Sequence, residues 1–228
     1  MSHDPNAHSD DRRAGGLCRR DFLSGLGFTV AVLGAGAVAP AIAKALASGS
    51  SPGGASAGKT LIVYLTRTRN TKAVAEILHQ EVGGTVVEVE AATPYPENYD
   101  AIVAQVDEEN ESGYAPPLER QIENIQRYDT VFVGFPTWDM QLPPPMKTFL
   151  SQHDLSGKTV LPFNTNGGYG AGSSFKTVKD LCVDCRVLEG FSTRGGLERD
   201  GIHLAIKGRR RKEVHAEVAA WLQRVLPR

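Results

Sequence analysis

The stretch Leu61-Ile62-Val63-Tyr64-Leu65-Thr66-Arg67-Thr68-Arg69-Asn70-Thr71 decides the fold. Its first five residues are apolar and indicate a buried strand, and apolar side chains then recur at helical spacing, at Val74, Ile77, Leu78 and Val82. Residues 66–71 between them carry three hydroxyls, one amide and two guanidinium groups, and no acid. Because N–H groups at a helix start lack partners and the helix dipole favours an anion there, this loop predicts an anion site. Ordinary helix capping is the alternative, although a cap needs only one such residue.

The same alternation of strand and helix continues outward from this stretch. Five short runs rich in Val, Ile, Leu and Phe predict strands at Thr60–Leu65, Thr85–Val89, Thr130–Phe135, Thr159–Phe163 and Arg186–Phe191. Strands that alternate with helices predict an α/β fold, with a doubly wound five-stranded parallel sheet as the middle of three layers. Ligands of such sheets bind at the carboxyl ends of the strands, where the strand order reverses.

Two further loops end at that edge of the predicted sheet. After the third strand come Pro136, Thr137, Trp138 and Asp139, and this Trp has a flat face that can stack on an aromatic ring. After the fourth strand the chain is rich in glycine, which lets backbone approach a ligand closely. That loop is Asn164, Thr165, Asn166, Gly167, Gly168, Tyr169 and Gly170. Each loop alone is weak evidence, but the three together predict a site for a phosphate-bearing aromatic ligand.

Leu61–Thr71, Gly134–Trp138 and Asn166–Gly170 together resemble the flavodoxin family, and Pro94–Asp100 and Phe149–Lys158 are similar to a bacterial branch of it. The resemblance covers Lys59 to the C-terminus. It implies strand order 2-1-3-4-5 and non-covalent FMN. It also implies that the phosphate lies on Thr66, Arg67, Thr68, Arg69, Asn70 and Thr71, and that the isoalloxazine lies between the other two loops.

Two positions depart from that family. The family often has Gly where this chain has Arg69. The loop after Trp138 has Asp139 and no nearby Gly, so a residue at positive φ there would be strained, and its carboxylate beside the ring would disfavour the anionic reduced flavin.

The first 58 residues differ from the rest in composition. Arg19-Arg20-Asp21-Phe22-Leu23 precedes an uncharged, weakly apolar stretch that ends in small residues, and it resembles a bacterial twin-arginine export signal. We expect a signal over residues 1–47, cleaved near Ala43 or Ala47 or else kept as an anchor, then a flexible Gly/Ser linker over residues 48–58. The domain of residues 59–228 would then work outside the cytoplasm.

The remaining features leave alternatives open. Cys182 and Cys185 form either a local disulfide or two buried thiols, and His79, His153, His203 and His215 are interpreted as surface residues. The crossover from 92 to 129 is longer than one helix needs, and its helix at Asn98–Glu109 either ends in solvent or forms a rim over the ligand or a docking patch. The basic run from Lys207 to Lys212 is either a solvated turn or a docking patch.

The sequence therefore predicts an FMN-binding redox protein. A net charge of −1 gives no bias toward nucleic acid or membrane, and residues 59–228 hold 20 Lys and Arg against 22 Asp and Glu. An electron carrier usually has a more acidic surface, which favours an FMN-dependent oxidoreductase that uses NAD(P)H or a quinone over a carrier for a redox partner protein. The alternative is a flavin-free binding or regulatory module, which Arg69 and Asp139 would favour.

Overall fold

The computed structural model describes residues 59–226, so the predicted export signal and linker lie outside the described residues. Six strands form one parallel sheet: β1 (Thr60–Tyr64), β2 (Thr85–Glu88), β3 (Thr130–Pro136), β4 (Thr159–Asn166), β5 (Arg186–Val187) and β6 (Phe191–Arg194). The order is β2-β1-β3-β4-β5, with β6 also paired to β4, which confirms the predicted order 2-1-3-4-5. The order reverses beside β1, so the carboxyl ends of β1, β3 and β4 meet at one edge.

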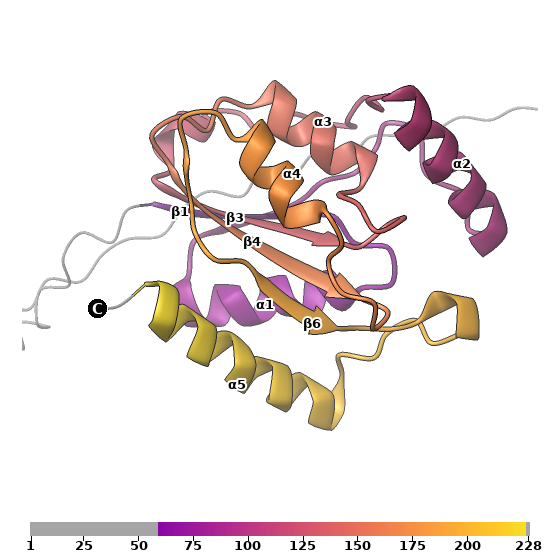
Figure 1. The fold of residues 1–228 in the computed structure, drawn as a ribbon. Helices are drawn as coiled ribbons and strands as arrows, with labels where there is room; N and C mark the ends of the chain where they lie inside the picture. Colours follow the sequence, from indigo (N-terminus) through magenta and orange to yellow (C-terminus); the bar gives the residue numbers. More distant parts are fainter. Residues whose placement is uncertain (1–58, 227–228) are drawn as a thin grey trace, which may run out of the picture. The chain divides into compact units, whose positions relative to one another are not determined.

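Helices cover both faces of the sheet (Figure 1). α1 (Asn70–Val82) and α5 (Gly208–Val225) lie on one face, and α3 (Pro144–Gln152) and α4 (Ser174–Leu181) lie on the other. α2 (Tyr99–Ser112) stands at the side, above the carboxyl ends of the strands. Two short 3₁₀ turns complete the chain, η1 (Ile125–Arg127) and η2 (Glu198–Asp200).

Alternating side chains of β1 divide the core into two halves. Leu61 and Val63 pack with Met146 and Phe149 of α3, whereas Ile62 joins a second cluster with side chains of α1 and α5. This alternation follows from the twofold period of a strand, and burial on both faces explains why β1 is continuously apolar.

The predicted fifth strand is interrupted. β5 ends at Val187 and β6 begins at Phe191, and both pair with β4. Between them the carbonyl oxygen of Glu189 accepts a hydrogen bond of 2.9 Å from the indole Nε1 of Trp221 on α5. The strand is therefore interrupted where a backbone oxygen accepts a hydrogen bond from a helix side chain and not from a neighbouring strand.

Two open predictions are resolved in this part of the chain. Cys182 and Cys185 form a disulfide. The surface interpretation was wrong for His153, which is buried: its Nε2 accepts from the N–H of Ile122 at 3.0 Å, and its Nδ1 lies 2.9 Å from the Phe149 carbonyl oxygen.

Within residues 59–226 no helix is both long and apolar enough to cross a membrane.

Candidate functional site: a cavity at the carboxyl edge of the sheet

The loop between β1 and α1 leaves its backbone donors free. Among the described residues, the N–H groups of residues 66–72 reach no hydrogen-bond acceptor. The hydroxyl Oγ1 of Thr66 is buried and also has no partner. A buried polar atom without a partner costs about 1–3 kcal/mol, so this loop fits an anion with several acceptor oxygens.

Two side chains of this loop, Asn70 and Thr71, already form hydrogen bonds to other residues of the protein. Asn70 donates from Nδ2 to Thr68 Oγ1 at 2.8 Å, and its Oδ1 accepts from the N–H groups of Ala205 and Ile206 at 3.0 Å each. The hydroxyl of Thr71 lies 2.9 Å from that of Thr165 on β4. The sequence treated all four Thr and Asn side chains as possible donors to the anion, but these two hold the loop in shape.

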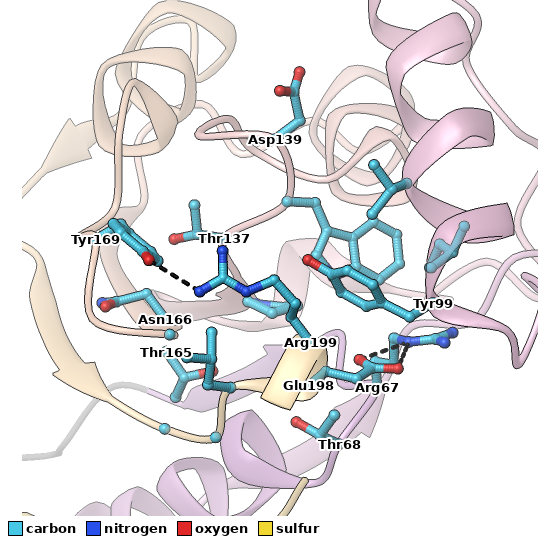
Figure 2. Close-up of a pocket in the computed structure, with 18 of the residues that line it drawn as sticks. Arg67, Thr68, Tyr99, Thr137, Asp139, Thr165, Asn166, Tyr169, Glu198 and Arg199 are labelled. Carbon is cyan, nitrogen blue, oxygen red and sulfur yellow. Dashed lines mark hydrogen bonds and ion pairs between the residues drawn. The ribbon is translucent and has the colours of Figure 1, made fainter. Parts of the chain in front are cut away.

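The two arginines of the loop have different surroundings. The guanidinium of Arg67 donates to both carboxylate oxygens of Glu198, at 2.7 and 2.9 Å, and to the carbonyl oxygens of Pro96 and Glu97, at 2.7 Å each (Figure 2). It therefore fastens η2 and the start of α2 to the loop. Arg69 is exposed at φ +65°, in the left-handed region that favours glycine, which is the physical reason why glycine suits this position.

The loop after β3 is a tight turn. Trp138 and Gln141 exchange backbone hydrogen bonds of 3.3 and 2.8 Å, and Asp139 and Met140 between them have φ of +46° and +52°. Two central residues at positive φ define a type I′ turn, in which Asn or Gly is usual. Both residues therefore lie in the region that favours glycine, although this loop has no glycine.

The indole of Trp138 lines the cavity and meets the ring of Tyr95 edge to face at 5.0 Å. Burial, and then the hydrogen bond that its hydroxyl donates to Glu109, raise the pKa of Tyr95 well above its usual range. Tyr95 thus stays neutral and holds one edge of the Trp138 ring in place.

The carboxylate of Asp139 does not face the cavity. Figure 2 shows it pointing away from the other labelled residues, and its Oδ2 accepts hydrogen bonds of 3.0 Å from Asn110 Nδ2 and from Gln141 Nε2. Lys147 completes this network by donating to Asn110 Oδ1 and Gln141 Oε1, and burial lowers the pKa of its amine. α2 and the turn itself hold this carboxylate, so its effect on a bound flavin ring stays a prediction.

The glycine-rich loop is shaped by one side chain. Asn166 Oδ1 accepts from the N–H groups of Gly168 and Gly170 at 2.8 and 3.1 Å, and both glycines have positive φ. Asn164 is fully buried behind the cavity wall and donates to Thr137 Oγ1 at 2.9 Å, which ties this loop to the loop after β3. Tyr169 stands at the rim, 66% exposed.

These loops enclose a cavity of about 340 Å³. Of the residues predicted for the site, twelve line it: Arg67, Thr68, Asn70, Pro136, Thr137, Trp138, Asp139, Thr165, Asn166, Gly167, Tyr169 and Gly170. Thr66 borders an adjoining hollow of about 470 Å³ that also reaches Tyr95 and Trp138. Arg69, Thr71, Asn164 and Gly168 are not among the lining residues.

Two segments of the cavity wall were missed from the sequence. One is the face of α2 with Tyr99, Ile102, Val103, Val106 and Asp107, and the other is the turn after β6 from Gly195 to Arg199. The excess length of the 92–129 crossover was the available signal for the first, and its interpretation as a rim over the ligand matches the structure. Gly195-Gly196 was the signal for the second.

The basic run, which the structure places at Lys207 and in the first turns of α5, is mostly paired. Arg210 contacts Glu217 at 2.7 Å, Arg211 contacts Glu76 of α1 at 3.1 Å, and Arg209 contacts Glu213 at 3.4 Å. Since three cations of the run meet acids of the same chain, a structural role is favoured over a docking patch.

A parallel sheet of order 2-1-3-4-5 with an anion loop after its first strand defines the flavodoxin-like class of α/β proteins. A family model described as Flavodoxin matches residues 59–207, and the chain belongs to that family. Comparison with curated proteins gave no match.

Solved structures agree with this fold. A candidate flavoprotein from Bacteroides eggerthii is 29% identical with a TM-score of 0.60, over 75% of this chain and 99% of its own. Another from Bacteroides uniformis is 27% identical with a TM-score of 0.56, over 63% and 94%. A flavoprotein from Lactobacillus acidophilus, solved in complex with FMN, is 22% identical with a TM-score of 0.54, over 60% and 93%.

Proposed function

We propose that this chain is an FMN-binding redox protein that works outside the cytoplasm, as an FMN-dependent oxidoreductase in preference to a simple electron carrier. The observation that carries the proposal is the β1–α1 loop, where the N–H groups of residues 66–72 and the buried Thr66 hydroxyl have no acceptor among the described residues. Family membership and the FMN complex of the Lactobacillus acidophilus relative support FMN as the group that satisfies them.

Different residues of the cavity would bind different parts of FMN. The β1–α1 loop would hold the phosphate, the rings of Trp138 and Tyr169 would lie against the isoalloxazine, and the backbone of residues 167–170 would meet its polar edge. The bound flavin supplies the electron and hydride chemistry. The chain's own part is to orient the ring, to exclude water from its buried face and to hold the loops together through Asn164, Thr137 and Asn166.

Two observations favour an oxidoreductase. The surface charge of residues 59–228 is nearly balanced, which gives little electrostatic steering toward a redox partner protein. The cavity also extends past the three loops to the apolar face of α2. The acceptor or donor of the NAD(P)H or quinone type would enter there.

The export part of the proposal rests on Arg19-Arg20-Asp21-Phe22-Leu23 and the uncharged stretch that follows. The twin-arginine route carries folded proteins, so it suits a chain that binds its cofactor before export. Replacing both arginines by lysine should keep the protein in the cytoplasm of a bacterial host. Unchanged export of this variant in cell fractionation would contradict the assignment.

The flavin-free alternative is not favoured by the geometry. Arg69 occupies its left-handed position with the side chain exposed, and the Asp139 carboxylate is held away from the cavity. Neither residue therefore obstructs the cavity, as that alternative would require.

The proposal is tested by titrating the full chain with FMN and following the quenching of flavin fluorescence. We expect stoichiometric binding, and Thr66→Val should weaken it about tenfold because one hydroxyl donor is lost without a change in shape. Thr177→Val on α4, outside the cavity lining, is the matched control and should bind as the parent does. A parent chain that leaves FMN fluorescence unchanged would overturn the proposal.

A further inference from the structure

The face of α2 gives the cavity an apolar wall that the three loops do not require. Tyr99, Ile102, Val103 and Val106 all line the cavity, and their spacing of three and four residues places them on one face of the helix. Ile102 and Val106 are buried, but Val103 stays 49% exposed and Tyr99 36%. α2 therefore turns apolar surface toward the opening of the cavity.

Two further exposed apolar side chains lie around the same opening. Met140, at the tip of the turn after β3, is 46% exposed, and Tyr169 of the glycine-rich loop lies at the rim. Half of the exposed large apolar side chains of the described residues thus line one cavity: Tyr99, Val103, Met140 and Tyr169. Apolar side chains gathered at an opening mark a binding surface, since each loses contact with water when a ligand arrives.

One arginine of the cavity wall is only weakly hydrogen-bonded and keeps free N–H donors. Three of the five N–H donors of Arg67 already bond to Glu198 and to two carbonyl oxygens, at 2.7 to 2.9 Å. Arg199 of η2 is exposed and bonds only weakly, to Asp200 Oδ1 and to the hydroxyl oxygen of Tyr169, at 3.3 Å each. Figure 2 shows its guanidinium beside Tyr169. Three of its five N–H donors, and the Tyr169 hydroxyl proton, are left for a ligand oxygen.

We propose that the α2 face, Met140, Arg199 and Tyr169 form a subsite for a flat, uncharged, carbonyl-bearing electron acceptor of the quinone class. The proposal rests on the proposed function, because the acceptor is placed beside bound FMN. The ring of the acceptor lies against the apolar wall, and a carbonyl oxygen accepts hydrogen bonds from Arg199 and Tyr169. Such donors favour a carbonyl oxygen as negative charge develops on it.

The electron and proton balance of the step is simple. Bound FMN in its reduced form would supply a hydride, and water a proton, so that the quinone would leave as the hydroquinone. The balance needs a reductant, and a reduced redox protein in weak contact, without electrostatic steering, would return two electrons while one proton enters from water.

The charges of the wall select against a nicotinamide dinucleotide. Asp107 lines the cavity, and Glu108 and Glu111 follow it on α2. A diphosphate carries two negative charges and would meet Asp107, while Arg67, one of the two lining cations of the described chain, is already bonded to Glu198. A neutral acceptor avoids this repulsion.

The test measures ligand binding to the full chain loaded with oxidised FMN. Calorimetric titration with 2-methyl-1,4-naphthoquinone should show saturable binding, and Val103→Asp and Arg199→Gln should each weaken it about tenfold or more. Val183→Asp is the matched control, since Val183 is 68% exposed and does not line the cavity. All three variants should keep FMN affinity within about threefold of the parent, because none of the three substitutions lies in the β1–α1 loop. NADH should give no saturable binding.

Each other outcome overturns the proposal in a recognisable way. Quinone binding that is unchanged in both cavity variants removes the subsite but leaves the proposed function intact. Equal loss of quinone and FMN affinity would mean that the α2 face contacts the flavin itself. Saturable NADH binding that depends on Arg199 would assign the cation to a dinucleotide. A parent chain that binds no FMN fails the proposed function as well. Because Arg199 is exposed, its variant tests the subsite even if Val103→Asp does not fold.

Discussion

The side-chain amide of Asn70 donates a hydrogen bond of 2.7 Å to the carbonyl oxygen of His203, 133 residues further along the chain. The oxygen of the same amide accepts from the N–H groups of Ala205 and Ile206 in that segment. The loop after β1 and the segment that leads into α5 are thus joined through one buried side chain, which keeps the anion loop in shape before any ligand arrives.

Removal of the Asn70 amide should therefore cost stability and ligand affinity together. Asn70→Ala leaves one buried and one part-buried N–H group without an acceptor, so we expect the free energy of unfolding to fall by about 2–3 kcal/mol in denaturant titration. FMN affinity should fall as well, because the loop is no longer held. Gln80→Ala, on the exposed face of α1, is the control and should change stability by less than about 0.5 kcal/mol. Equal stability of Asn70→Ala and Gln80→Ala would contradict the role of the Asn70 amide in holding the loop.

The left-handed backbone at Arg69 makes a second prediction. Arg69→Gly should be more stable than Arg69→Ala by about 1 kcal/mol, since glycine adopts φ +65° without strain. Both variants should keep FMN affinity close to that of the parent if the backbone and not the side chain holds the phosphate. Loss of FMN binding in both would instead show that the guanidinium contacts the ligand.

Local patterns predicted the sheet well for a physical reason. Leu61 to Tyr64 are buried on both faces, so their apolar character is visible without knowledge of their partners. The anion loop was visible for a similar reason, because helix ends concentrate hydroxyl and amide side chains within a few residues.

The missed features depend on partners that are far away in the sequence. Arg67 bonds to Glu198, 131 residues away, and between β5 and β6 a backbone oxygen of Glu189 accepts from Trp221, 32 residues on. The α2 wall was hidden because Asp107, Glu108 and Glu111 give that helix an acidic composition, although Tyr99, Val103 and Val106 share one face.

The disulfide gives a third prediction. Cys182 and Cys185 close a very short loop, so the double variant Cys182→Ser/Cys185→Ser should lose about 2 kcal/mol of stability. FMN affinity should not change, because neither cysteine lines the cavity. Thermal unfolding of the parent with and without reductant checks the result: a reductant should lower the melting temperature of the parent and leave that of the variant unchanged.

Asp154 makes the fourth prediction, on pH dependence. Hydrogen bonds from the side chain and backbone of Ser156 to its carboxylate hold the pKa of Asp154 below its usual value, and the backbone bond is 2.9 Å long. A pKa that is lowered on folding contributes stability that is complete above about pH 4 and is lost as the pH falls through the folded-state pKa. Asp154→Asn should therefore show a shallower loss of stability in acid. An identical acid slope in urea titrations of parent and variant would contradict this account.

The measurement that tests the central claim most directly compares FMN with riboflavin, which has the same ring system and no phosphate. If the free N–H groups of residues 66–72 and the Thr66 hydroxyl form a phosphate site, the full chain should bind FMN at least about 100-fold more tightly than riboflavin in fluorescence titration. Equal affinity for the two flavins, or no affinity for either, would contradict it.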